Sequence, residues 1–241
     1  MTESYLTFTR EVLNNWQIAS LALIGGILPA FLWLWLWLKE DRRKPEPKIR
    51  IALTFFLGAT MSLLTIPIQY SFETIFLTAI PLVILGAFSE ELFKYLSAYL
   101  SALSTKVTDE PIDSIIYLIT AALGFSAMEN SLYLLAPLFE GSLLYSFTLL
   151  NFRFVGASLL HVAASGIIGI FIAFSFKKPA GYRRFMTFLG LILATGLHAL
   201  FNLLIMKGEV LAMISVLAVV WTIVVVILLL FEKVKTLPKN F

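Results

Sequence analysis

The sequence predicts an all-α, polytopic membrane protein with about seven transmembrane helices, and its composition is the first reason. Hydrophobic residues make up 59% of the 241 positions, charged residues make up only 14%, and the mean hydropathy is +0.91. A typical soluble domain carries about 25% charged residues. A soluble protein of this size could not cover so much apolar surface, so a soluble globular enzyme is excluded.

The length of the apolar stretches is the second reason, because a helix needs about 20 mostly apolar residues to cross a bilayer. The first stretch is too long for a cleaved signal peptide and lacks a small-residue cleavage site. The third is long for one crossing, so we expect it to tilt or to break near Pro81 or Gly86. The loops are too short to fold alone, which predicts one integral-membrane domain over 1–241. The predicted spans are 18–38, 51–70, 75–103, 114–139, 154–176, 185–206 and 210–231.

The basic residues of the loops predict the direction of the helices, because cytoplasmic loops are enriched in Lys and Arg. Fourteen of the 18 Lys and Arg residues follow the first, third and fifth spans or lie in the C-terminal tail. The three on the opposite side are Arg10, Arg153 and Lys207. We therefore expect the N-terminus outside and the C-terminus in the cytoplasm.

Charge and cysteine content narrow the function further. The net charge is only +3, which argues against a nucleic-acid partner. The chain has no cysteine, so disulfides, thiolate metal ligands and cysteine nucleophiles are excluded. Its two histidines are His161 and His198, and both fall inside predicted spans.

Four formal charges lie within the predicted spans, where ionisable groups are costly. They are Glu90, Glu91 and Lys94 in the third span and Glu129 in the fourth. Each costs about 2.5–3.5 kcal/mol at the centre of a membrane helix, so the set would cost on the order of 10 kcal/mol if unpaired. Such groups persist where they pair, line a wet cavity or perform chemistry.

The spacing of these charges predicts how they pair. Glu90 precedes Lys94 by four residues, which is the favourable order for a helical ion pair, whereas Glu91 precedes it by three. We therefore expect Lys94 to pair mainly with Glu90. Glu91 would then lack a counter-charge and could accept a proton from water, which is what a general base does.

Polar residues in three other spans lie at similar depth by residue count. His198 and Asn202 are four apart and share one helix face. His161 lies in the fifth span, and Asn130 follows Glu129 in the fourth. Any one of these could be an ordinary interhelical hydrogen bond. Their joint occurrence predicts one shared polar site.

These residues carry a resemblance to the PrsW family of intramembrane proteases. The matching strings are S-E-E-L-F-K at 89–94, G-F-S-A-M-E-N-S-L-Y at 124–133, the segment from Arg153 to His161, and H-A-L-F-N at 198–202. The motif-bearing core covers about 75–206. More distantly, the pattern is similar to the type II CAAX prenyl endopeptidases. Some PrsW members carry an acidic residue at the position of Asn202, and the asparagine is closer to the prenyl endopeptidase pattern.

The resemblance implies an endopeptidase of the prokaryotic cell membrane that cuts a membrane-anchored or lipid-modified protein. In the PrsW family proper, the substrate class is a single-span anti-sigma factor. Carried over by motif, Glu90 and Glu91 form the catalytic pair, His161 and His198 are the catalytic histidines, and Asn202 helps to hold the oxyanion. Supporting family positions are Lys94, Glu129, Asn130 and Arg153.

The residues available favour hydrolysis by an activated water without a cofactor. No serine stands in a G-x-S-x-G elbow, and no aspartate lies at the centre of a predicted span. A zinc site made by His161, His198 and a glutamate is a less favoured alternative, because H-E-x-x-H is absent and the ligands would come from three helices. We therefore expect no metal.

Three other classes remain open. The first is a non-catalytic scaffold of the same fold that binds a partner's transmembrane helix. The second is a proton-coupled transporter, which also uses buried Glu, His and Lys, although no inverted similarity between spans is visible. The third is a retinal pigment, which ranks lowest because the buried Lys94 stands beside two acids. Substituting Glu90 and Glu91 singly would separate a protease from a scaffold.

Overall fold

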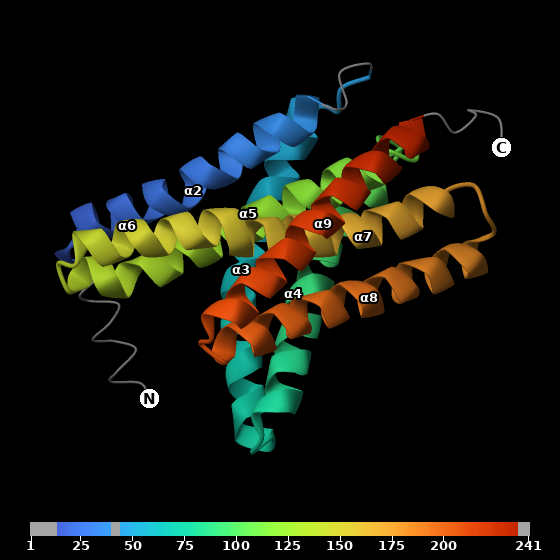
Figure 1. Ribbon diagram of the computed structural model, residues 1–241. Helices are drawn as coiled ribbons and strands as arrows, with labels where there is room; N and C mark the ends of the chain where they lie inside the picture. The colour runs from blue at the N-terminus through green and yellow to red at the C-terminus, as the bar shows by residue number, and fades with distance from the viewer. Residues whose placement is uncertain (1–13, 40–43, 236–241) are drawn as a thin grey trace.

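The computed structural model describes residues 14–39 and 44–235, and every regular element within them is helical (Figure 1). Two short π-helical stretches continue neighbouring α-helices rather than standing alone. The elements are α2 (Trp16–Leu38), α3 (Lys48–Ile75), α4 (Ala79–Ala98), η2 (Tyr99–Leu103), α5 (Asp113–Phe139), α6 (Leu143–Phe152), η3 (Arg153–Ala157), α7 (Ser158–Phe174), α8 (Ala180–Met206) and α9 (Val210–Lys235).

The helices confirm a polytopic membrane bundle. Within the described residues, six helical segments are long and apolar enough to cross a bilayer: α2, α3, α5, the continuous segment Leu143–Phe174, α8 and α9. The remaining predicted span, the third, corresponds to α4 with η2. That helix is long enough to cross, but it carries Glu90, Glu91 and Lys94 in its middle.

Helix α5 forms the centre of the bundle, where it packs against α2, α3 and α7. Its first half is buried on every side, from Asp113 to Ala127. A helix that is apolar all round belongs in such a position. At the crossing with α3, a Cβ atom on Gly124 would overlap the carbonyl oxygen of Phe55, and one on Gly58 would overlap that of Ala121. These two glycines therefore let the two backbones touch.

Two of the differences between the predicted spans and the helices affect residues discussed above. The fifth span begins at Leu143 rather than 154, because the ten residues of α6 are as apolar as a span and continue through η3 into α7. Arg153 therefore lies inside a span and not on the outer side. The third span begins at Ala79 rather than 75 and runs without a break to Leu103. Pro81 lies in its first turn, where proline is tolerated.

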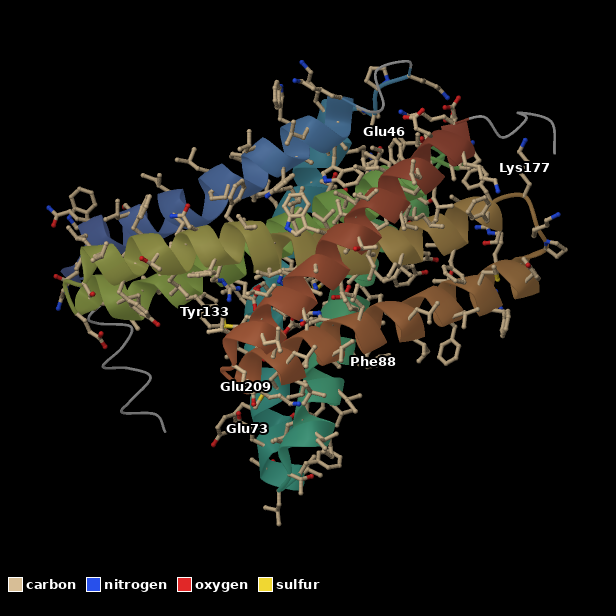
Figure 2. The ribbon with its side chains drawn as sticks, viewed as in Figure 1. Glu46, Glu73, Phe88, Tyr133, Lys177 and Glu209 are labelled. Carbon is tan, nitrogen blue, oxygen red and sulfur yellow. The ribbon has the colours of Figure 1, made fainter. Side chains whose placement is uncertain are left out.

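The ends of the helices fall into two sets. Lys44 in the loop before α3 pairs with Asp109 in the loop before α5, with 2.6 Å between Nζ and Oδ1, so these two loops lie at the same end. Figure 2 places Glu46 and Lys177 at that end, and Glu73, Tyr133 and Glu209 at the other. The loops with most of the basic residues therefore share one end of the bundle.

Candidate functional site

Two adjacent glutamates of α4 meet different surroundings. Lys94 Nζ lies 2.6 Å from Glu91 Oε1 and 3.9 Å from Glu90 Oε2. His198 Nδ1 on α8 lies 2.7 Å from the same Glu91 Oε1, and Ser165 on α7 donates to Oε2 at 3.4 Å. Glu91 and Lys94 are both fully buried. Glu91 is thus held by one ion pair and two further donors.

The expectation that Lys94 pairs mainly with Glu90 was therefore wrong. Both spacings bring a carboxylate within reach of the lysine, so the tertiary neighbours decide between them. His161 on α7 accepts a hydrogen bond from Lys94 at its Nδ1, 2.7 Å away, and this contact directs the lysine toward the face that carries Glu91. Lys94 also lies 4.7 Å from the ring centre of Phe125. The carboxylate without a close counter-charge is Glu90.

Glu90 lies beside the charge pair and is also buried. Its Oε1 accepts a hydrogen bond from Gln69 Nε2 on α3, at 3.0 Å. Among the described residues its Oε2 has no hydrogen-bond partner. It lies 3.6 Å from His198 Nε2, too far for a direct hydrogen bond. In a neutral imidazole whose Nδ1 donates to the Glu91 carboxylate, Nε2 is an acceptor. A carboxylate oxygen and an imidazole nitrogen thus face each other without a proton donor between them.

His161 is held from both sides. Its Nδ1 accepts from Lys94, so its Nε2 carries the hydrogen and donates to Glu129 Oε2 at 2.8 Å. The same oxygen accepts from Arg153 at 2.8 Å, and Arg153 Nε donates to Asn130 Oδ1 at 2.6 Å. Arg153 stands at the first residue of η3. The π-helical turn thus places Arg153, in the middle of the span Leu143–Phe174, against Glu129 of α5.

These groups surround one cavity of about 720 Å³, which confirms that the polar residues of four helices meet. Glu91 and Lys94 lie behind its wall. The two histidine rings are 5.2 Å apart between centres. The predicted site residues that line the cavity are Glu90, Glu129, Arg153, His161, His198 and Asn202.

The sequence interpretation missed Gln69. Gln69 lies near the end of the second predicted span, 51–70. Its polar side chain in an apolar helix was the signal in the sequence that could have marked it as a site residue. It belongs to α3, which carries no part of the recognised motifs. Only the packing of α3 against α4 brings it to Glu90.

Three side chains form a donor set that could hold a metal ion. Ligand atoms of Glu90, His161 and His198 all lie within 4.8 Å of one another, and such a His₂Glu set is typical of catalytic zinc. His198 is arranged for this role, since a ligating histidine usually donates its other N–H to a carboxylate. Glu90 Oε2 is buried and unpartnered. His161 could bind a metal ion only if it gave up one of its present hydrogen bonds, because both of its nitrogens already have partners.

Comparison with known proteins identifies the family of the chain. The family model described as PrsW family intramembrane metalloprotease matches residues 46–230. The Protease PrsW of Halalkalibacterium halodurans is 28% identical over 73% of this chain and 80% of its own length. Those of Geobacillus kaustophilus and Bacillus subtilis are 25% and 28% identical, over 76% and 64% of this chain and 79% and 66% of their own lengths. No solved structure matches the chain. The chain therefore belongs to the PrsW family of intramembrane metalloproteases and is a multi-pass membrane protease.

Proposed function

We propose that this protease hydrolyses a peptide bond within or next to the membrane, in a membrane-anchored protein, with Glu90 as the base that activates water. One observation carries the proposal. Glu90 Oε2 is buried beside His198 Nε2, without a hydrogen-bond partner in the part of the chain that the structure describes. It lies at the wall of a cavity large enough for a peptide segment. A general base must be able to accept a proton, and this oxygen is free to do so.

Glu91 and Lys94 serve a different purpose in this proposal. Glu91 is neutralised by Lys94 and oriented by His198 and Ser165, so it has little capacity left for a substrate proton. It fixes the imidazole of His198, whose Nε2 then faces the attacking water. After attack, Glu90 returns its proton to the leaving nitrogen.

The oxyanion requires donors that point into the same cavity. Asn202 lies one turn after His198 and lines the cavity, so its side-chain amide is the proposed donor. His161 is the second candidate, because its Nε2–H would be available if Glu129 moved away. Removing one such donor typically lowers the rate by about 10²–10³.

A zinc ion would be held by Glu90, His198 and His161, and when bound it would polarise the scissile carbonyl and acidify a water molecule. The neighbours of His161 favour the metal-free route. Lys94 donates to His161 Nδ1 at 2.7 Å, so a cation already stands beside the donor set. A zinc ion there would also have to displace Glu129 from Nε2.

The test is cleavage of single-span peptides from a library by the purified protein in lipid vesicles. Glu90→Gln keeps the shape of the side chain but removes the proton acceptor, so cleavage should collapse while the variant stays folded. Glu140→Gln, at an exposed acid of the α5–α6 turn, is the matched control and should cleave normally. Activity should also survive a strong chelator.

Two results would contradict parts of this proposal. Full cleavage by Glu90→Gln would remove its role as the base, and an inactive wild-type protein that still binds the peptides would support the scaffold alternative. Loss of activity on chelation, restored by zinc, would show that the donor set works with a metal.

A further inference from the structure

A second depression lies on the outer surface of the bundle, next to the active-site cavity. Its volume is about 360 Å³, and almost all of its wall comes from α6 and η3. The residue from the other side is Leu217 of α9. We call this depression the α6–α9 groove, and it is lined by Phe147, Thr148, Asn151, Phe152, Val155 and Leu217.

The groove and the active-site cavity share part of their walls. Thr148, Phe152 and Leu217 line both. The barrier between them is therefore about one side chain thick. A displacement of these side chains would join the outer surface, which faces lipid, to the space beside Glu90.

The surface of the groove is unusual for a lipid-facing one. Thr148 and Asn151 are exposed there, and each donates to a carbonyl of its own helix: Leu144 at 2.9 Å for the threonine and Phe147 at 2.7 Å for the asparagine. Polar side chains in transmembrane helices usually serve contacts between helices. Phe147 and Phe152 flank them and are 66% and 57% exposed, so the groove offers apolar area together with two polar side chains.

Helix α9 closes the groove at Leu217 and makes a second contact further along, at Trp221. At the closed point, Leu217 packs on Gly156, and a Cβ atom on that glycine would come within 3.0 Å of Leu217 Cδ2. One turn later, Trp221 meets Trp33 of α2, which also packs on Phe154 and donates to its carbonyl. The contact that closes the groove at Leu217 is therefore separate from the one that holds α9 at Trp221.

From this geometry we infer that the α6–α9 groove binds the transmembrane helix of the substrate, and that separation of Leu217 from Gly156 admits the substrate to the cavity. The inference rests on the proposed function and adds the route of entry. A substrate helix in the groove gains the apolar contacts of Phe147 and Phe152. The polar side chains of the groove can bond its backbone where the helix unwinds.

The experiment links the two sides of the groove covalently. The natural chain has no cysteine, so the double variant Gly156→Cys/Leu217→Cys contains only the engineered pair. After oxidation with diamide, cleavage of a single-span peptide in vesicles should be lost, and reduction should restore it. Thiol titration measures how completely the pair has closed.

A matched pair controls for linking α9 as such. Gly166 on α7 contacts Ile227 on α9 in the same way, with 2.9 Å between the position of an added Cβ atom and Ile227 Cδ1. Gly166→Cys/Ile227→Cys joins the same two spans further from the groove. Its oxidised form should cleave as fast as its reduced form. Loss of activity in both pairs, or full activity in the linked groove pair, would overturn the inference.

Photocrosslinking tests binding separately from cleavage. A photoreactive phenylalanine at Val155, in the groove, should capture the single-span peptide when introduced into Glu90→Gln. The same group at Ile192, an exposed residue of α8, should not. Equal capture at both positions would reject the groove even if cleavage holds. Capture at Val155 without any cleavage by the wild type would reject the proposed function but not the groove.

Discussion

Glu90 and Glu91 are chemically identical and adjacent, but their environments differ. Glu91 accepts hydrogen bonds from Lys94, His198 and Ser165. Within residues 14–39 and 44–235, Glu90 accepts one only from Gln69 and keeps one oxygen without a partner. In a low-dielectric interior, a paired carboxylate is costly to remove, because its counter-charge is left buried. The two residues should therefore differ in stability as well as in activity.

We predict that Glu91→Gln destabilises the protein, by about 3–5 kcal/mol, because breaking a buried ion pair leaves Lys94 uncompensated. Glu90→Gln should leave stability unchanged or raise it slightly, since it removes a buried charge that lacks a close counter-charge. Thermal unfolding in detergent measures both. Equal stability of the two variants would show that Lys94 does not depend on Glu91.

Gln69 should act through Glu90, because its amide fixes the carboxylate that we propose as the base. A hydrogen bond to a charged group is worth about 1.5–3 kcal/mol, so Gln69→Leu should lower kcat by about 10- to 100-fold. KM should stay close to that of the wild type. Gln17→Leu, at the other glutamine of the chain and exposed on α2, is the control. A change confined to KM would instead place Gln69 in substrate binding.

At the scale of the elements, the crossing of α3 and α5 positions the site. Its two glycines bring the helix backbones into contact, and α3 then carries Gln69 to α4 while α5 carries Glu129 and Asn130 to α7. The helices cannot separate locally without moving these side chains. The glycines are thus structural residues on which the active-site geometry depends.

Gly124→Ala should therefore destabilise the bundle by on the order of 1–3 kcal/mol or more, because the new methyl group meets backbone and not a flexible side chain. Gly196→Ala is the matched control on α8, since a Cβ atom there meets nothing within 4 Å. It should be neutral or stabilising by about 0.5–1 kcal/mol, as expected for glycine in a helix interior. Thermal unfolding should rank the two variants in this order, and the reverse order would contradict the close crossing.

At the scale of the whole molecule, the cavity lies toward one end of the bundle. It is lined by Glu73 near the end of α3, Leu82 near the start of α4, Met206 at the end of α8 and Met213 near the start of α9. This is the end opposite Glu46 and Lys177 (Figure 2). With the orientation expected from the basic loops, the cavity opens in the outer half of the membrane.

That orientation can be tested with single cysteines. In intact cells, a membrane-impermeant maleimide should label Glu209→Cys, in the loop between α8 and α9. Lys177→Cys, in the loop between α7 and α8, should react only after permeabilisation, because the loops rich in Lys and Arg face the cytoplasm. The wild type has no cysteine and gives the background. The opposite labelling pattern would invert the bundle.

Composition and spacing along the chain were enough to predict the class of fold and to point to most of the polar residues that line the cavity. Hydropathy and helix length predict spans because lipid requires every backbone group to be satisfied within its own helix. Charges inside spans point to Glu90, Glu91, Lys94 and Glu129, because their cost requires compensation. These signals are local in the chain, so they can be read without knowing which helices touch.

The pairing of these charged and polar residues depends on how the helices pack. Lys94 can reach either glutamate from the same helix, and the choice depends on His161 of α7 and His198 of α8. Gln69 becomes part of the site because α3 packs on α4. Arg153 pairs with Glu129 because α6 continues through η3 into α7. These partners are distant in sequence, and spacing along one helix carries no information about the side chains that a neighbouring helix contributes.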